Sequence, residues 1–305
     1  MIPYTAVPEQ IELEVYVTVP TGLADGKQSV WGRVNLGDAA PHSFIEGPVL
    51  LPDGSLCVVD VAWGRILRVW PDRHVEVVGE YEGEPNGMTQ WHGNQLLIAD
   101  FKHGLMSFDL AGGRDAPFET VLERFGPERF KGVNDLIMTS DGTVYFTDQG
   151  ATGFQDSSGR LFRLGTDGEL RCVLDSIPSP NGLVFDEAAQ TLYLAVTRDN
   201  SIWRVPLASG SPHKTGRFIQ LSGGVGPDGL ALGKGGELFV AHLGMGAVWV
   251  FDRYGVPLKV LRSPRGRSTS NVTVSDDMVV YVTESQTGTI LTANLGGLLA
   301  MEDDR

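Results

Sequence analysis

The sequence predicts an all-β fold, a six-bladed β-propeller whose ring is closed by an N-terminal strand that joins the last blade. Three observations predict it: a pattern of two short strands recurs six times, the spacing is nearly regular, and no helix-period run of convincing length occurs. Short strands separated by turn signals at a period in the forties are typical of propellers, where each repeat forms one blade. We therefore expect a single domain over residues 1–305.

Each repeat opens on a residue with a side-chain oxygen, which we call its anchor. An apolar strand, a polar or glycine-rich turn and a second strand rich in Val, Leu, Phe and Tyr follow the anchor. The anchors lie 40, 48, 47, 47 and 43 residues apart, and a third strand follows in most repeats. The blades are therefore expected to begin near the six anchors, which are Glu46, Asn86, Asn134, Asn181, Asp228 and Asn271.

The first 45 residues are expected to close the ring and to form a loop. IELEVYVTVP, which begins at residue 11, alternates like a strand, and the last repeat stops after its third strand near Asn294. We predict that residues 11–19 supply the missing outer strand of the last blade. The segment TGLADGKQSVWGRVNLGDAAPHSF that follows is interpreted as a loop over one face.

Composition and charge exclude several classes of protein. The net charge of −14 disfavours nucleic acid as a partner, because phosphates require clustered Lys and Arg. Apolar runs are far shorter than the roughly 20 residues that span a bilayer, so we expect no membrane partner. The N-terminus MIPYTAVPEQ does not resemble a signal peptide. Cys57 and Cys172 lie in strand patterns of different blades, which predicts buried free thiols and favours a cytoplasmic location.

The anchors predict a metal site. In a propeller the first strand of every blade lines the central channel, so the six anchors should form a ring of two carboxylates and four amides. Such a ring suits a hard divalent cation with oxygen ligands, calcium first, with Mg²⁺, Mn²⁺ or Zn²⁺ as alternatives. Simple turn chemistry is the competing interpretation of Asn-Gly and Asp-Gly pairs. It does not explain Glu46, which Gly-Pro follows.

Four motifs in this order, EGPV, VNDL, PNGL and PDGLAL, resemble the SMP-30/gluconolactonase/luciferin-regenerating-enzyme family over residues 46–294. The resemblance implies a six-bladed, calcium-dependent propeller, most of whose relatives open sugar lactones. It also implies a division of the anchors. The metal ligands would be Glu46, Asn134, Asn181 and Asp228, whereas Asn86 and Asn271 would lie behind the ligands or contact the substrate.

Single positions of this chain can also be compared with the family. Asp148 resembles the Thr-Asp element of the family, which implies a catalytic role in orienting water or a ligand, with a turn-capping aspartate as the alternative. Phosphatase-type members carry a histidine where this chain has Ser285, and sugar lactonases often carry an arginine where it has Gly132. The identity of the lactone is therefore left open.

These features predict a divalent-metal-dependent hydrolase that opens a lactone. The ion would polarise the carbonyl, and Asp228 would act as general base or as nucleophile. Two alternatives remain. One is a non-catalytic binding propeller with a structural axial calcium, and the other is an organophosphate or aryl-ester hydrolase of the same architecture.

The substrate is expected to be a small lactone or ester bound at the rim of the channel. Residues that follow each second strand should border this pocket, because those strands return to the same face. The candidate substrate contacts there are Trp63, His103, Arg198 and His242. Asp199 offers Arg198 a local partner. The oligomeric state is left open.

Overall fold

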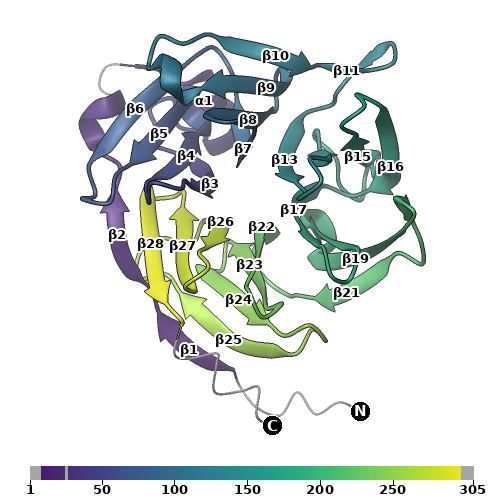
Figure 1. Cartoon of the computed structure of the whole chain (residues 1–305). Coiled ribbons are helices and arrows are strands. Elements are labelled where there is room, and N and C mark those ends of the chain that lie inside the picture. The colour runs from purple at the N-terminus through teal and green to yellow at the C-terminus, as the bar shows by residue number, and fades with distance from the viewer. Residues whose placement is uncertain (1–7, 25–26, 297–305) are drawn as a thin grey trace.

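The computed structural model describes residues 8–24 and 27–296. Its strands form six blades around a central axis (Figure 1). We number the blades by their innermost strands, which are β3 (Ile45–Leu50), β7 (Pro85–Gln90), β13 (Val133–Met138), β17 (Pro180–Asp186), β22 (Gly226–Leu232) and β26 (Thr269–Val274). The predicted six-bladed propeller is confirmed. The first seven residues lie outside the described residues. They belong to the N-terminal segment whose sequence does not resemble a signal peptide.

From the innermost strand, the next strands of each blade run outward in chain order as an antiparallel meander, to which N-terminal strands add in blades 5 and 6. The second strands are β4 (Leu56–Asp60), β8 (Gln95–Asp100), β14 (Val144–Asp148), β18 (Thr191–Val196), β23 (Leu238–Leu243) and β27 (Val279–Glu284). The third strands are β5 (Arg65–Val69), β9 (Gly104–Asp109), β15 (Gly159–Leu164), β19 (Ser201–Ala208), β24 (Ala247–Phe251) and β28 (Thr289–Asn294). The outer strands of blades 1–5 are β6 (Val75–Glu80), β10 (Phe118–Leu122), β16 (Leu170–Ile177), β21 (Gly216–Gln220) and β25 (Pro257–Arg262).

Short elements complete the connections. The strands β11 (Arg124–Phe125) and β12 (Glu128–Arg129) form a small hairpin after blade 2, and β20 (Ser211–Pro212) pairs with the end of β19. The 3₁₀ helices are η1 (Thr21–Ala24), η2 (Val61–Trp63), η3 (Leu110–Gly112) and η4 (Thr197–Asp199).

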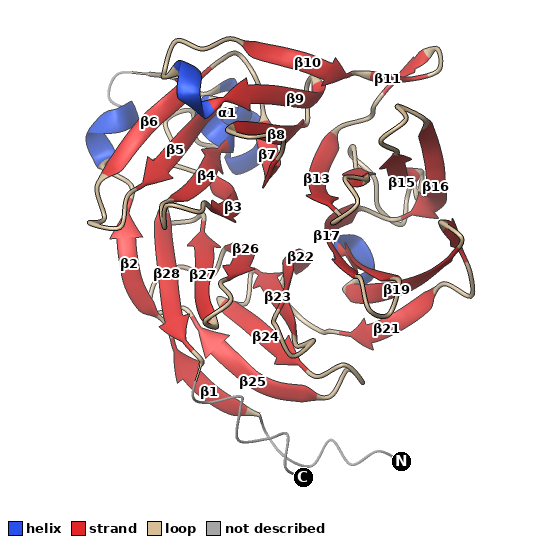
Figure 2. Cartoon of the chain, in the orientation of Figure 1, coloured by secondary structure: helices blue, strands red, loops and turns tan. Residues whose placement is uncertain are grey.

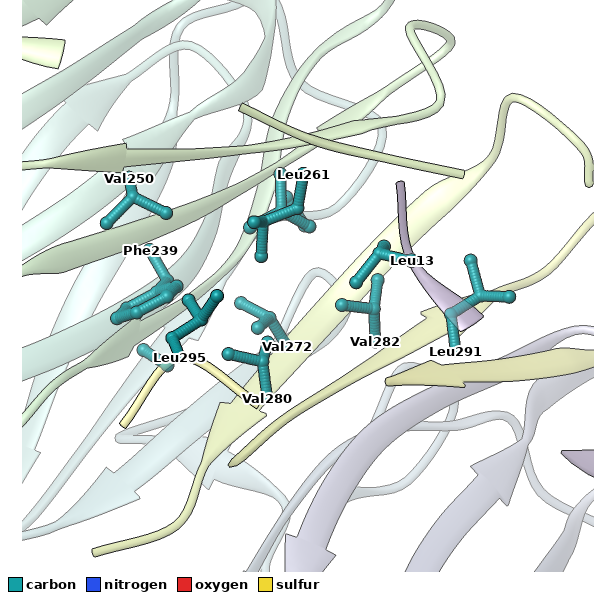
Figure 3. Close-up of a cluster of buried hydrophobic side chains, with 12 residues drawn as sticks. Leu13, Phe239, Val250, Leu261, Val272, Val280, Val282, Leu291 and Leu295 are labelled. Atoms are coloured by element: carbon teal, nitrogen blue, oxygen red, sulfur yellow. The ribbon is translucent and has the colours of Figure 1, made fainter. Parts of the chain in front are cut away.

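The N-terminal segment closes the ring, as predicted. Strand β2 (Glu14–Thr18) is the outer strand of blade 6 and pairs antiparallel with β28. The preceding strand β1 (Glu9–Glu12), which the sequence did not suggest, pairs parallel with β25 of blade 5. Leu13 between them is buried in the cluster that blades 5 and 6 share (Figure 3). One segment therefore holds two neighbouring blades together.

The hydrophobic core is divided among the interfaces between blades. Six clusters of buried side chains are present in the described residues, and each draws on two adjacent blades. Alternate side chains of each strand point to opposite faces of its sheet, so one blade supplies residues to both neighbours. The apolar residues therefore pack between blades, and the polar anchors are left for the axis.

The segment interpreted as a loop contains a helix, so that interpretation was wrong at residues 30–36. Helix α1 (Val30–Leu36) begins after Ser29, whose Oγ accepts a hydrogen bond from the Gly32 N–H at 2.9 Å, and ends at Gly37 with φ 70°. Ser29 also donates to the carbonyl of Ala62 in η2 at 2.6 Å, which fixes α1 beside blade 1 (Figure 2). Two turns are too short for helical periodicity to be visible in a sequence.

Both cysteines are free, as predicted, although only Cys57 is fully buried and Cys172 is half-buried. Burial raises the pKa of the Cys57 thiol to about 12. No helix in the described residues is long and apolar enough to cross a membrane.

Candidate metal centre

A β-bulge lies at or beside the anchor in every blade. The register between first and second strands shifts in all six, for example between Glu46 and Val49 in blade 1 and between Pro227 and Leu230 in blade 5. A bulge bends its strand and redirects the side chain at that point. Every anchor therefore lies at the edge of, or inside, an interruption of the regular strand pairing.

Glycines beside the anchors allow neighbouring innermost strands to approach closely. A Cβ added to Gly87 would lie 2.2 Å from Oδ1 of Asp135, and one added to Gly182 would lie 2.4 Å from the Asp228 carbonyl oxygen. No side chain fits at such distances. The Asn-Gly and Asp-Gly pairs lie inside strands β7, β17 and β22. Their glycines therefore serve close packing around the axis, and turn chemistry does not explain them.

Five of the six anchors are buried, and Asn86 is half-buried. Glu46 is only 3% exposed and Asp228 only 7%. The structure thus withdraws these carboxylates from water, which is costly for an ionised group unless it gains partners.

Asn134 presents an oxygen without a partner. Its Nδ2 donates to Oε1 of Gln149 at 3.0 Å, and Nε2 of Gln149 donates in turn to Oγ of Ser179 at 3.1 Å. Its Oδ1 is buried and accepts no hydrogen bond from any described residue. A buried acceptor without a partner is unfavourable. The Asn134 oxygen is thus a buried acceptor that no described residue satisfies.

A third carboxylate lies at the axis, at Asp135, where the sequence analysis assigned no function. Asp135 follows the anchor of blade 3, and its side chain occupies the space that Gly87 leaves open. Its Oδ1 accepts the Leu136 N–H at 2.8 Å. Burial raises the pKa of Asp135 to about 7, against hydrogen bonds from Leu136 and the Asn271 side chain that lower it.

The three carboxyl groups repel one another. Burial first, and then the charges of Asp228 and Asp135, raise the pKa of Glu46 well above its usual range. Burial and the charge of Asp135 raise the pKa of Asp228 to about 8, although a hydrogen bond from Asn181 and the positive charge of Arg198 oppose this. The sequence predicted a ring with two carboxylates and four amides. The third carboxylate makes the fully ionised site more negative than that expectation.

Asn271 lies against carboxylates of the ring, which is the geometry of a residue behind the ligands, one of the two positions that the resemblance implied for it. Its Oδ1 accepts the Val272 N–H at 2.8 Å, and its side chain is a hydrogen-bond partner of both Glu46 and Asp135. Asn271 therefore orients two acids of the site. The remaining anchor, Asn86, makes no side-chain hydrogen bond to a described residue.

Asp148 is a structural residue in this geometry, which corrects the catalytic role suggested for it. The carboxylate is fully buried, and its Oδ1 accepts the N–H groups of Lys131 and Gly132 at 2.7 and 2.9 Å. Nε and Nη2 of Arg160 donate to its Oδ2 at 3.0 and 2.6 Å. Both oxygens are thus committed to the segment that enters β13 and to β15, which leaves none for water or substrate.

The two histidines are also engaged elsewhere, so their assignment as substrate contacts is not supported by their geometry. His242 is fully buried: Trp249 Nε1 donates to its Nδ1 at 3.2 Å, and its Nε2 therefore donates to the Gly223 carbonyl at 3.0 Å. Burial lowers the pKa of His242, which favours this neutral form. The Nε2 of His103 lies 2.7 Å from the Glu82 carbonyl oxygen.

A cavity of about 640 Å³ lies beside Asn181, lined by the loops that follow β14 and β18 and by parts of blades 4 and 5. Arg198 lines this cavity, as expected for a substrate contact. Trp63 does not. It is half-buried at the end of η2, with the Arg65 guanidinium 5.9 Å from its ring centroid. A second cavity of about 580 Å³ follows the innermost strands away from the anchors and is lined by Asp135 and Asn271. Each of the two cavities thus touches the ring of anchors, one at Asn181 and the other at Asn271.

Comparisons with known proteins agree with this architecture. Residues 44–286 match the model of the SMP-30/Gluconolactonase/LRE-like region. The gluconolactonase of Zymomonas mobilis is 27% identical over 76% of this chain and 73% of its own length. The pentonolactonase of Haloferax volcanii is 29% identical over 78% of this chain and 80% of its own.

Solved structures show the same fold. A gluconolactonase from Xanthomonas campestris superimposes with a TM-score of 0.74 at 24% identity, over 92% of this chain and 98% of that one. Regucalcin from Agrobacterium tumefaciens, described as a calcium-binding protein, gives a TM-score of 0.72 at 21% identity over 94% and 95% of the two chains. Since the family model spans most of the sequence and the blades it covers are all present, this chain belongs to the SMP-30/gluconolactonase/LRE-like family.

Proposed function

We propose that this protein is a divalent-metal-dependent lactonase whose active centre is the ring of anchors. Relatives named gluconolactonase and pentonolactonase support lactone hydrolysis as the reaction class. The observation that carries the metal is local: buried, mutually repelling carboxyl groups lie with an amide oxygen that has no partner in the described residues. A dication relieves both the repulsion and the unsatisfied acceptor.

Glu46, Asn134, Asn181 and Asp228 would hold this ion, with calcium as the first choice. These ligands offer only oxygen, which hard cations prefer, whereas zinc favours nitrogen and sulfur ligands. Glu46, Asp135 and Asp228 lie near enough to repel one another, but no three His, Cys, Asp or Glu side chains of the described residues are placed to hold a metal ion by themselves. Amides are therefore required for the site to be complete. A bound dication would polarise the lactone carbonyl and stabilise the negative charge that develops on its oxygen.

Asp228 is the proposed reacting group of the protein. As a general base it would take a proton from the attacking water, and as a nucleophile it would attack the carbonyl carbon itself. Either role requires the ionised carboxylate. The hydrogen bond from Asn181 and the positive charge of Arg198 both favour that form, against the burial that disfavours it. Asn181, a neighbour in the ring, also donates to Oγ1 of Thr197 at 3.2 Å, which fixes its amide.

The cavity beside Asn181 is the proposed substrate pocket. It contacts the ring directly, and most of its lining side chains are neutral and polar, among them Gln149, Thr152, Ser179 and Thr197. Such groups can hydrogen-bond the hydroxyls of a small polar lactone. The volume of about 640 Å³ lies within the usual range of small-molecule sites.

The test is acid release from a panel of sugar, aliphatic and aromatic lactones, measured with calcium and then with excess chelator. We expect turnover of at least one lactone, loss of activity with chelator and recovery on adding calcium. Isothermal titration of calcium into chelated protein measures the site independently. If calcium binds but no lactone or ester is hydrolysed with Ca²⁺, Mg²⁺, Mn²⁺ or Zn²⁺, the protein is a binding propeller and the proposal is wrong.

A further inference from the structure

Arg198 is the one charged residue among those that line the cavity beside the ring. The side chain is exposed, and it is close enough to the metal centre for its positive charge to lower the pKa of Asp228. The rest of the lining is neutral, both polar and apolar. The proposed pocket of this acidic protein therefore carries a single positive charge.

This arginine has no partner of its own in the described residues. Its sequence neighbour Asp199 was the expected partner, but the Asp199 carboxylate is bound by other groups. Nη2 and Nε of Arg217 donate to it at 2.6 and 3.0 Å, and Trp203 Nε1 donates at 3.0 Å. No hydrogen bond or ion pair of the Arg198 guanidinium to a described residue is present. The guanidinium is therefore available to an external anion.

The backbone that carries Arg198 is held firmly on both sides. Thr197 is buried, and its Oγ1 donates to the Pro227 carbonyl at 2.8 Å in the next blade. Asp199 is fixed by Arg217, as described, and Nδ2 of Asn200 donates to the Gly223 carbonyl at 2.8 Å. A cation on an ordered backbone loses less conformational freedom when it binds a ligand. Such preorganisation is typical of a binding residue.

We propose that the preferred substrates are lactones that carry a separate anionic group, a carboxylate or a phosphate, which Arg198 binds while the lactone carbonyl lies at the ring. This proposal rests on the lactonase function proposed above and narrows its substrate class. A planar guanidinium pairs with either anion through two parallel hydrogen bonds. The neutral polar side chains of the cavity are left for the hydroxyl groups of the substrate.

The experiment compares three lactones: D-glucono-1,5-lactone, which is neutral, D-glucaro-1,4-lactone, which bears a carboxylate, and 6-phospho-D-glucono-1,5-lactone. Wild-type protein, Arg198→Gln and the control Arg171→Gln are assayed with calcium. Arg171 lies on outer strand β16, is well exposed and pairs with Glu169, so its replacement changes net charge equally without touching the cavity.

We expect wild-type kcat/KM to be at least about tenfold higher for one or both anionic lactones than for the neutral one. Arg198→Gln should lower kcat/KM for the preferred anionic lactone by about 10- to 100-fold, mainly through KM. The neutral lactone should lose at least about tenfold less, and through kcat, because only the charge that favours ionised Asp228 is removed. The kcat/KM values for the carboxylate-bearing and the phosphate-bearing lactone show which of the two anions Arg198 prefers. Equal losses of kcat/KM on neutral and anionic lactones would place Arg198 at the reacting carbonyl. No loss of kcat/KM on either would show that Arg198 does not bind the substrate. Both results overturn the proposal.

A binding measurement keeps the test valid if no lactone is hydrolysed. Glucarate and gluconate differ by one carboxylate, and their affinities for calcium-loaded protein can be compared by calorimetry. We expect glucarate to bind more tightly, and Arg198→Gln to abolish that preference. If the two bind alike, or if the preference survives in Arg198→Gln, the inference about the anionic group is wrong, whatever the outcome for lactone hydrolysis.

Discussion

Two sets of acidic residues recur around this propeller, and they have opposite environments. The ring acids Glu46, Asp135 and Asp228 lie on innermost strands. A second set, which we call the latch acids, ends the second strands: Asp60, Asp100, Asp148 and Glu284. Both sets recur with the blade repeat, and all four latch acids are fully buried. Glu46 and Asp228 are buried as well, and Asp135 is half-buried, so residue type and burial alone do not separate the two sets.

The two sets differ in their partners. Each latch acid accepts a backbone N–H from the segment that enters the innermost strand of its own blade, from Phe44, Glu84, Lys131 and Ser268 respectively. Asp60 and Asp148 are also paired with Arg65 and Arg160. The ring acids instead face one another, with a few hydrogen bonds against several repulsions. A buried acid with every oxygen bound holds the fold together, whereas one left short of positive partners is a candidate for binding a cation, as proposed above for the ring.

The largest expected difference between the two sets is in turnover, on replacing a ring acid. Asp228→Asn keeps an oxygen at the ring but removes the negative charge and basicity of the side chain. We expect turnover to fall by about two orders of magnitude or more, the usual scale for losing a positioned acid–base group. Calcium should still bind at saturating concentration because three other ligands survive. Near-wild-type turnover in the calcium-loaded variant would show that Asp228 is a ligand only.

The matched change among the latch acids should affect stability instead. Asp148→Asn removes the charge that Arg160 and two backbone N–H groups contact, and breaking a buried ion pair costs about 3 kcal/mol or more. We expect the free energy of unfolding, measured in urea with calcium present, to fall by that amount. The kcat of the folded protein should change by less than about threefold. A loss of kcat comparable to that of Asp228→Asn would restore the catalytic role first suggested for Asp148.

An intermediate effect is expected for Glu46→Gln, on metal affinity. The change removes one negative charge from the ring with little change in volume, so calcium affinity in calorimetry should fall about tenfold or more. Circular dichroism should remain that of a β protein. Unchanged affinity would place the metal centre elsewhere in the molecule.

Without metal, the same variant should stabilise the fold, because the removed charge is then only a source of repulsion. Because the pKa of Glu46 is raised in the folded protein, the folded state holds a proton that the unfolded state releases near pH 4 to 5. The unfolding free energy of chelated wild type should therefore fall as pH rises from 5 to 8. Glu46→Gln should weaken this fall and be more stable than wild type at pH 8. A variant that is less stable than wild type in chelator at pH 8 would contradict the repulsion described for the ring.

The sequence predicted the ring because six anchors share one register, and that register reflects a repeated bulge. It missed Asp135, although the position carries a signal. Of the five other anchors, four are followed by glycine and the one in blade 6 by Val272, so only blade 3 has an acid there. What could not be predicted is that Gly87 on the neighbouring blade leaves room for the Asp135 side chain. This fit depends on the distance between strands that are 48 residues apart in sequence.

Asp148 and His242 show the other limit of the sequence. Both were placed correctly at the ends of second strands that return to the pocket face. Their roles differ from those suggested because their partners, Arg160 and Trp249, lie on the third strands of the same blades and saturate their polar atoms. Residue type and position suggest a site, but the hydrogen-bond partners decide whether a side chain is free to act. Helix α1 was missed for a simpler reason, its length of seven residues.

The smallest expected effect concerns Ser285, at the position where phosphatase-type relatives are expected to carry a histidine. Its Oγ donates to the Ile45 carbonyl at 2.6 Å, and Ser270 Oγ donates to the same carbonyl at 3.0 Å, so both hydroxyls join blade 6 to blade 1 where the ring closes. In Ser285→Ala the carbonyl keeps its second donor, whereas the hydrogen bonds of Ser285 Oγ to this carbonyl and to Ser270 Oγ, at 2.7 Å, are lost. We expect the unfolding free energy to fall by about 1 kcal/mol with turnover unchanged. Ser270→Ala combined with Ser285→Ala should cost more than the sum of the single changes, since the buried carbonyl then loses both side-chain donors. Urea unfolding of the four proteins measures this difference. Strictly additive losses of unfolding free energy would mean that the two hydroxyls do not act together on the Ile45 carbonyl. A large loss of turnover in Ser285→Ala would show that Ser285 has a catalytic role.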